Sequence, residues 1–174
     1  MGWLGLDDTD HLSGGCTTHA LFELLQSIPS NYEVQSHRLV RLYPFASRRT
    51  RGNAAVAVEI IGEDYDELMT FLESWWASKL LPLKGLISES DMSDRQQYPS
   101  DPGMVWFNDK ISADFYWKCV SREVTISEAP EATRSWGGNG IIGATAAVSW
   151  PALDYTYAVS YTHLRAHETP VNIV

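Results

Sequence analysis

The chain has 174 residues, of which 44% are hydrophobic and 20% charged, a balance that is typical of one globular core and excludes a disordered chain. Its net charge of −9 argues against a general nucleic-acid-binding surface, which has to be basic, and favours a cationic ligand. The sequence shows no apolar run of membrane-spanning length, no leader before its first strand, and no C-x-x-C pattern. We therefore expect a cytoplasmic protein that makes no membrane contact and has no structural zinc.

Hydrophobic periodicity predicts strands and helices in alternation along the chain. We expect strands at 3–6, 34–42, 54–61 and 104–107, and helices at 17–28, 65–80, 113–120 and 141–148. The polar stretch 88–103 is predicted to be a loop, and the segment before the glycines at 137–140 does not have a convincing strand pattern. This order predicts an α/β or α+β fold in which helices pack on a mixed sheet.

Three carboxylates, those of Asp7, Asp8 and Asp10, follow the first predicted strand. In a continuing strand Asp7 would point to one face and the other two to the opposite face, whereas a turn after Asp8 could bring all three together. Mg²⁺ usually takes one or two carboxylates together with water and phosphate oxygens. Aspartates are also common in ordinary turns, but the glycine turn close behind favours a site for Mg²⁺ and a nucleotide.

The segment Gly14-Gly15-Cys16-Thr17-Thr18 opens the first predicted helix, with Thr17 or Thr18 as its N-cap. Backbone N–H groups at a helix start attract anions, so this segment is a candidate for contact with ATP phosphates. No lysine follows the glycines, which excludes a Walker A loop. The alternative is a capped helix with no ligand.

Three arginines, Arg48, Arg49 and Arg51, stand just before a strand and against the acidic trend of the chain. Guanidinium groups match phosphate oxygens in pairs, and the following Gly52 and Asn53 allow a close backbone approach. We interpret this segment as a nucleotide contact, and a solvated basic loop is the alternative.

A second glycine-rich turn precedes the last predicted helix. Gly138, Gly140 and Gly143 fit the spacing G-x-G-x-x-G, which is a weak signal when it stands alone. The turn either contacts phosphate or allows the helix to pack closely, and the sequence leaves both open.

Taken together and in this order, short blocks spread over residues 2–148 resemble the catalytic part of the 2-agmatinylcytidine synthetase family, which modifies an isoleucine tRNA. The matching blocks are Gly5-Leu6-Asp7-Asp8-Thr9-Asp10, Gly15-Cys16-Thr17-Thr18, Arg38-Leu39-Val40-Arg41-Leu42, Thr50-Arg51-Gly52-Asn53, Asp101-Pro102-Gly103 and Gly140-Ile141-Ile142-Gly143-Ala144.

The resemblance implies an ATP-dependent ligase that activates the C2 carbonyl of a tRNA cytidine for attack by agmatine or another cationic amine. It implies that Asp7, Asp8 and Asp10 serve Mg²⁺ and the ATP phosphates, and that Thr17 is a threonine that can become phosphorylated. It also implies that Arg51 and the turn at 140–143 lie near the nucleotide.

The last segment, residues 159–174, resembles a translated sequencing adapter, so we expect residues 1–158 to be a fragment of a catalytic domain and exclude the tail from functional reasoning. Two other functions fit the same residues. One is a small-molecule kinase or amine ligase that does not act on tRNA, which a native chain ending soon after Ala158 would favour. The other is a nucleotide-binding domain without turnover.

Overall fold

The computed structural model describes residues 1–10, 15–49, 52–86 and 98–151. Its strands are β1 (Gly2–Asp7), β2 (Glu33–Arg41), β3 (Ala54–Ile61), β4 (Gly103–Phe107) and β5 (Arg134–Gly137). Its α-helices are α1 (Thr17–Ser27), α2 (Tyr65–Trp75), α3 (Asp114–Ser121) and α4 (Gly140–Ser149). Short π- and 3₁₀-helical turns lie at Trp76–Leu80, Leu81–Leu83 and Ile126–Glu128.

The strands form one sheet in the order β2-β3-β1-β4-β5, and each neighbouring pair is antiparallel. The prediction of a mixed sheet is therefore wrong in this detail, while helices packed on a sheet are confirmed. The first four strands with α1 and α2 follow the split βαβ arrangement, in which each helix connects two strands that flank a third. Beyond β4, α3, β5 and α4 extend this unit.

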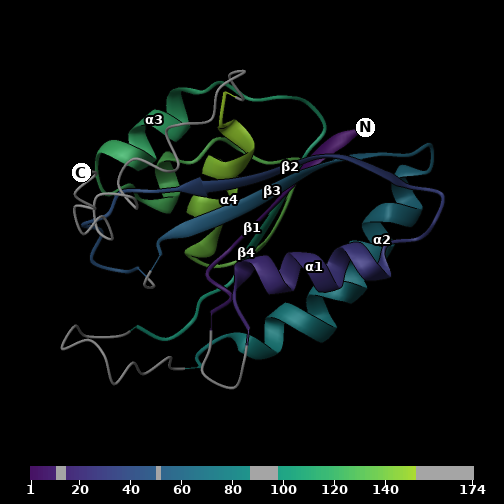
Figure 1. Ribbon diagram of the computed structural model, residues 1–174, viewed down its shortest axis with the longest axis horizontal. Helices are drawn as coiled ribbons and strands as arrows, with labels where there is room; N and C mark the ends of the chain where they lie inside the picture. Colours follow the sequence, from purple (N-terminus) through teal and green to yellow (C-terminus); the bar gives the residue numbers. More distant parts are fainter. Residues whose placement is uncertain (11–14, 50–51, 87–97, 152–174) are drawn as a thin grey trace, which may run out of the picture.

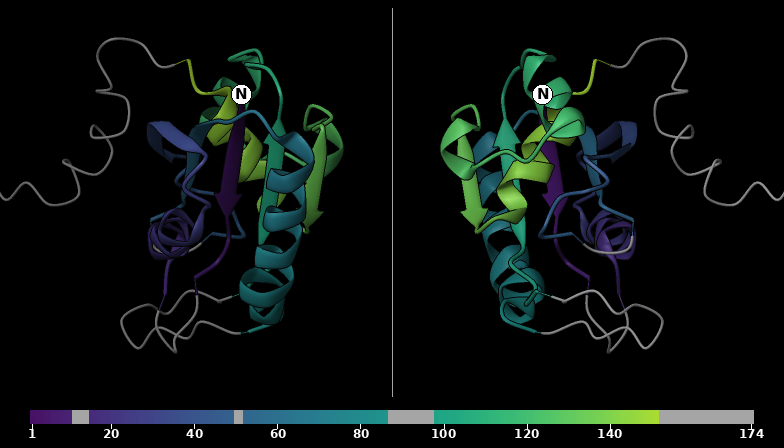
Figure 2. Two further views of the ribbon diagram at one scale, coloured as in Figure 1. Left: turned by 90° about the vertical axis from the view of Figure 1, so that its right-hand side faces the viewer. Right: turned by 90° about the vertical axis from the view of Figure 1, so that its left-hand side faces the viewer.

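The helices cover both faces of the sheet (Figures 1 and 2). On one face, Leu4 and Leu6 of β1 join a buried cluster with α1 and α2. On the other face, Trp3 of β1 joins a second cluster with α3 and α4. This alternation is what a strand buried on both faces requires, because successive side chains point to opposite sides.

Helix α4 packs unusually close to the sheet because both surfaces carry small residues. A Cβ at Gly5 of β1 would lie 2.3 Å from the carbonyl oxygen of Ala144. Ala144, Ala146 and Ala147 are all fully buried, so the small side chains of this helix let it pack tightly against the sheet. At the other end of α4, Arg38 of β2 holds the helix C-terminus.

The contacts of Arg38 are specific. Its guanidinium donates to the carbonyl oxygens of Val148 (2.8 Å) and Trp150 (3.1 Å), and its centre lies 3.5 Å from the centroid of the Trp3 ring. The end of a helix leaves carbonyl groups without intrahelical partners, and an arginine can satisfy them.

Two further expectations need correction. The predicted helix 65–80 is α-helical only to Trp75 and continues as a π-helical turn. The segment before the last helix, for which no strand was expected, is β5, an edge strand paired with β4. None of the helices in the described ranges has the length and apolar character needed to cross a bilayer.

Candidate functional site

A cavity of about 260 Å³ lies where β1 and β2 end and α4 begins. It gathers side chains from segments far apart in the sequence. The lining residues are Asp7, Asp8, Asp10, Leu42, Tyr43, Ala46, Ser47, Arg48, Arg49, Asn53, Tyr98, Ser100, Cys119, Arg122, Glu123, Val124, Thr125, Asn139, Gly140, Ile142 and Gly143.

The acid loop, residues 7–10, turns directly after β1. The strand ends at Asp7, and Asp8 has a φ of 57°, in the left-handed region that aspartate tolerates better than most residues. Asp7, Asp8 and Asp10 consequently all line the cavity. The alternative in which a continuing strand separates the three carboxylates is therefore excluded.

The buried position of two of these carboxylates changes their acidity. Burial, followed by repulsion from Asp8, raises the pKa of Asp7 well above its usual value. Burial raises the pKa of Asp8 to about 6, although the backbone N–H of Asp101 and the charge of Arg48 act in the opposite direction. Two neighbouring carboxylates that resist ionisation form a place where a bound cation would be stabilising.

The third carboxylate already has a structural partner. The backbone N–H of Thr17 donates to Asp10 Oδ1 (3.2 Å), and the N-cap of α1 is Cys16, whose side chain makes no capping hydrogen bond. The prediction of Thr17 or Thr18 as N-cap is therefore wrong, because Asp10 caps the helix from outside. Thr17 itself is buried, with its hydroxyl 3.3 Å from that of Thr9.

This arrangement removes the start of α1 from the cavity. Of the residues predicted there, Gly15, Cys16, Thr17 and Thr18 are described, and none lines the cavity. Gly14 lies outside the described residues, as does Arg51. The predicted contacts of these residues with ATP, and the phosphorylation of Thr17, stay predictions.

Another wall of the cavity is basic. Arg48 and Arg49 both line it, and the guanidinium of Arg48 lies 5.1 Å from the centroid of the Tyr98 ring. Asn53 supports this wall with its side-chain amide, which donates to the carbonyl oxygen of Tyr43 (2.7 Å), and it too has a positive φ, of 36°. Among the described residues, Asp8 and Asn53 are the two non-glycine positions with positive φ, and both face the cavity. Unusual backbone conformations of this kind cluster at functional sites.

The glycine turn, residues 137–140, leads into α4, and the N–H groups of residues 138–140 are already occupied. The N–H of Gly138 donates to the carbonyl oxygen of Pro102, and the N–H of Asn139 donates to Asp101 Oδ2. The N–H of Gly140 donates to the carbonyl oxygen of Asp101. The next two N–H groups, at positions 141 and 142, donate to carbonyl oxygens of the turn itself. The structure therefore favours close packing over phosphate contact as the role of Gly138. A Cβ at Gly140 would lie 2.3 Å from the backbone nitrogen of Gly103, and one at Gly143 would lie 1.8 Å from Asp7 Oδ2.

Residues 98–101 connect the acid loop with the wall that carries Arg48. The sequence predicted this segment only as part of a polar loop. Ser100 donates its hydroxyl to the carbonyl oxygen of Asp10, and the backbone N–H of Asp101 donates to Asp8 Oδ2 (3.1 Å). Arg48 in turn donates to the carbonyl oxygen of Pro99 (3.5 Å). Sequence reasoning missed Ser100, Asp101 and Tyr98 as site residues, although the block Asp101-Pro102-Gly103 was part of the family resemblance.

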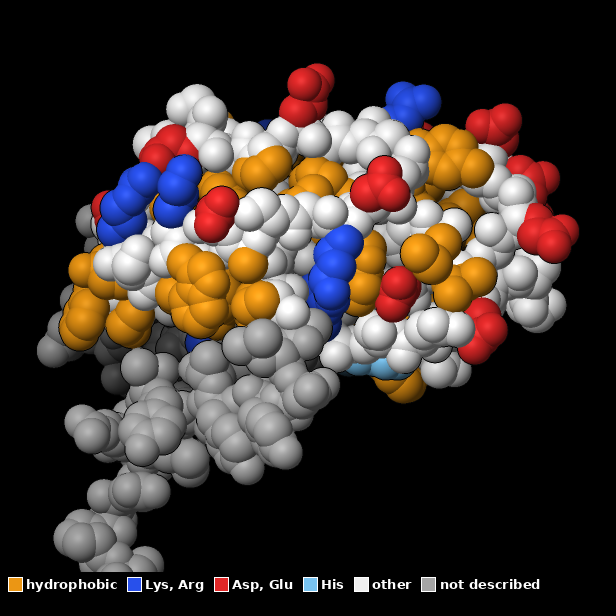
Figure 3. All heavy atoms as spheres, turned by 90° about the horizontal axis from the view of Figure 1, so that it is seen from above, with side chains coloured by type: hydrophobic (Ala, Val, Ile, Leu, Met, Phe, Trp, Pro, Cys, Tyr) orange, Lys and Arg blue, Asp and Glu red, His pale blue; other side chains and the backbone are white. Residues whose placement is uncertain are grey.

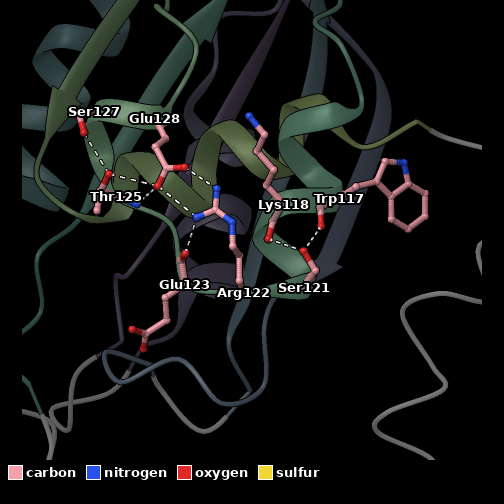
Figure 4. A network of polar contacts seen from close by, with 8 residues as sticks. All are labelled: Trp117, Lys118, Ser121, Arg122, Glu123, Thr125, Ser127 and Glu128. Atoms are coloured by element: carbon pink, nitrogen blue, oxygen red, sulfur yellow. Dashed lines mark hydrogen bonds and ion pairs between the residues drawn. The ribbon is translucent and has the colours of Figure 1, made fainter.

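One edge of the cavity is formed by the segment that follows α3 (Figure 4). Arg122 is held by the carboxylate of Glu128, to which its guanidinium nitrogens donate at 3.2 and 2.5 Å. Glu128 also accepts from the backbone N–H of Thr125 (3.0 Å), and Glu123 accepts from the backbone N–H of Ser47. The Arg122 guanidinium at this edge of the cavity is therefore already paired with a carboxylate of the protein.

Comparison with known proteins gives this geometry a context. The family model described as the TiaS TCKD domain matches residues 3–139. A relative named TiaS, the isoleucine-tRNA 2-agmatinylcytidine synthetase of Thermoplasma volcanium, is 33% identical, in an alignment that covers 96% of this chain and 43% of the relative. The enzyme of the same name from Methanocorpusculum labreanum is 31% identical, with 88% of this chain and 36% of the relative covered. The chain therefore spans less than half the length of these curated relatives.

Solved structures agree with the sequence comparison. The crystal structure of apo TiaS aligns with a TM-score of 0.63 and 26% identity. The crystal structure of TiaS in complex with its isoleucine tRNA and ATP aligns with a TM-score of 0.66 and 25% identity. Each alignment covers 87% of this chain and 36% of the solved one.

Proposed function

The chain belongs to the TiaS TCKD domain family, and we propose that it is the ATP-binding catalytic part of a ligase that joins agmatine to a tRNA cytidine. The observation that carries this proposal is the cavity whose lining brings together the acid loop and Arg48 and Arg49. Carboxylates on one wall and arginines on the other suit a metal ion and a polyphosphate bound side by side. The curated relatives carry the name of this reaction, and one solved relative is described as a complex with an isoleucine tRNA and ATP.

The residues of the acid loop fit Mg²⁺. This ion prefers oxygen ligands and commonly binds through one or two carboxylates and substrate phosphates. Asp10 Oδ1 already accepts a hydrogen bond from the start of α1, and Asp8 Oδ2 accepts one from the N–H of Asp101. We therefore assign the metal contacts chiefly to Asp7 and to the second oxygen of Asp8. A bound Mg²⁺ would neutralise charge on the phosphates.

The remainder of the cavity suits the nucleotide. Arg48 and Arg49 present guanidinium groups to phosphate oxygens. Apolar and aromatic side chains, among them Leu42, Tyr43 and Ile142, line the same cavity and offer an environment for a base. The family resemblance implies that Arg51 also lies near the nucleotide.

The chemistry follows from these roles. The C2 oxygen of a cytidine is a poor leaving group, and a phosphoryl group on that oxygen turns it into phosphate, which an amine can displace. The arginines stabilise the charge that develops on the transferred group, and the carboxylates of the acid loop would hold the Mg²⁺ that offsets the phosphate charge. Thr17, as the family's phosphorylated threonine, would have to leave its buried contact with Thr9 to accept a phosphoryl group.

The distribution of charge on the surface is compatible with binding both agmatine, which is a cation, and tRNA, which is a polyanion. Figure 3 shows acidic side chains gathered at the end of the molecule where α2 begins, whereas acidic and basic side chains are interspersed at the end that carries α3. The exposed residues Asp64, Asp66 and Glu67 stand at that acidic end. The net charge of −9 is therefore not spread evenly, and the cavity keeps its own basic wall beside which a tRNA phosphate can lie.

The test is to follow nucleotides by phosphorus NMR in a mixture of the protein, Mg²⁺-ATP, agmatine and unmodified tRNA. We expect ATP consumption that requires both agmatine and tRNA, is lost in Asp8→Ala, and persists in Asp66→Ala, an exposed aspartate on α2. Consumption that is indifferent to tRNA would replace the tRNA acceptor by a small molecule. No consumption in any mixture, with nucleotide binding retained, would leave a binding domain without turnover.

A further inference from the structure

Asp101 is tied to the glycine turn by both its side chain and its backbone. Its Oδ2 accepts from the backbone N–H and from the side-chain amide of Asn139, each at 2.7 Å. Its carbonyl oxygen accepts from the N–H of Gly140 (2.9 Å), and Lys84 Nζ lies 3.6 Å from Oδ1. The side chain is only 17% exposed, so these hydrogen bonds to a charged group are partly shielded from water and hold the residue in one orientation.

The same residue holds the acid loop. The backbone N–H of Asp101 donates to Asp8 Oδ2 (3.1 Å), and the neighbouring Ser100 donates its hydroxyl to the carbonyl oxygen of Asp10. A backbone N–H can direct a carboxylate only if its own peptide group is fixed. Here the carboxylate of Asp101 fixes that peptide by anchoring it to Asn139.

The glycines around Asp101 show that this contact is built into the fold. A Cβ at Gly138 would lie 2.0 Å from Asp101 Oδ1, and one at Gly103 would lie 1.9 Å from the backbone nitrogen of Ile141. Any side chain at these positions would push the glycine turn away from Asp101. The turn also starts α4, and Gly143 of that helix lies against the carboxylate of Asp7.

We propose that Asp101 is a positioning residue, which sets the orientation of the Asp8 carboxylate and the distance between the acid loop and α4. This inference rests on the proposed function, in which Asp8 is a ligand of the metal that accompanies ATP. Asp101 does not itself contact the metal. Groups that orient a metal ligand contribute strongly to metal affinity even though they stand behind it.

The experiment is a double-mutant cycle between Asp101 and Asp8, read by Mn²⁺ binding in electron paramagnetic resonance with a non-hydrolysable ATP analogue present. Asp101→Ala is expected to weaken Mn²⁺ binding by about tenfold. In an Asp8→Asn background the same substitution is expected to change Mn²⁺ binding by less than about twofold, because the group through which Asp101 acts has lost its charge. Binding of the analogue in EDTA is expected to be equal in Asp101→Ala and in the wild type. Asp66→Ala is the matched control and should leave every value unchanged.

The outcomes separate this inference from the proposed function. Equal losses of Mn²⁺ affinity in both backgrounds would assign Asp101 a general structural role and overturn the inference. The same holds if Asp8→Asn weakens binding while Asp101→Ala does not. Absence of Mn²⁺ binding by the wild type with the analogue would overturn the proposed function and this inference with it.

A second variant guards against misfolding. Asp101→Asn keeps the volume of the side chain and one oxygen that can accept both hydrogen bonds from Asn139, but it loses the charge. It is expected to weaken Mn²⁺ binding by about threefold, again only where Asp8 is intact. An Asp101→Asn protein that binds Mn²⁺ as the wild type does would contradict the proposed role.

Discussion

Replacing Gly143 by alanine tests whether the Asp7 carboxylate lies against the first turns of α4. The added Cβ would be 1.8 Å from Asp7 Oδ2, 2.6 Å from Asp7 Cγ and 3.0 Å from Leu42 Cδ1. In an unobstructed helix the substitution would stabilise the protein by about 1 kcal/mol. Here the carboxylate has to move, and overpacking of this kind costs about 1–3 kcal/mol. Gly143→Ala alone should therefore lower the free energy of unfolding by about 0–2 kcal/mol.

The Asp7→Ala background removes the obstruction and isolates the contact. There, Gly143→Ala should raise the free energy of unfolding by up to about 1 kcal/mol, so the two substitutions should show a coupling energy of about 1–3 kcal/mol. Urea unfolding followed by tryptophan fluorescence measures all four proteins. Effects of Gly143→Ala that agree within about 0.5 kcal/mol in the two backgrounds would refute the placement of Asp7 against α4.

Further predictions follow from single residues. Burial raises the pKa of the Cys119 thiol to about 12, whereas Cys16 is exposed, so iodoacetamide should modify Cys16 alone in the native protein and both thiols in urea. Burial raises the pKa of Asp8 from 3.8 to about 6. As the pH rises, the unfolded protein therefore loses the Asp8 proton before the folded protein does. The free energy of unfolding consequently falls between pH 3.8 and pH 6. In EDTA, urea unfolding of the wild type should therefore lose up to about 3 kcal/mol over this window relative to Asp8→Asn, and parallel pH profiles would contradict the burial of Asp8. Arg38→Met removes the hydrogen bonds at the end of α4 and should lower the free energy of unfolding by about 2–4 kcal/mol; a loss below about 0.5 kcal/mol, the range of surface substitutions, would show that Arg38 does not hold the helix.

The elements of the fold could be predicted where the pattern is local. The β-branched residues of β3 and the helical spacing in α2 are sufficient to indicate a strand and a helix, and the alanines of α4 indicate close packing. Strand direction and the pairing of β5 with β4 depend on contacts between distant segments, which periodicity does not contain. A four-residue edge strand also gives too short a pattern to recognise.

The residues of the candidate site could likewise be predicted only where they lie close together in the sequence. The acid loop and the arginines are compact in sequence, and their chemistry was visible there. The role of Asp101 was not, because its partner Asp8 is 93 positions away. The start of α1 looked like an anion site because its N–H groups were assumed free, whereas Asp10, seven positions before Thr17, accepts one of them. A side chain that satisfies a helix terminus from a preceding loop cannot be told from a ligand contact by composition alone.

We propose that the acid loop and the wall formed by Arg48 and Arg49 together hold a metal ion and a nucleotide. The most direct measurement is an anomalous difference map from crystals of the protein soaked with Mn²⁺ and a non-hydrolysable ATP analogue. We expect a Mn²⁺ peak within coordination distance of the carboxylates of Asp7 and Asp8, with the phosphates of the analogue between that peak and Arg48. A Mn²⁺ peak elsewhere on the protein, or phosphates bound away from Arg48, would contradict it.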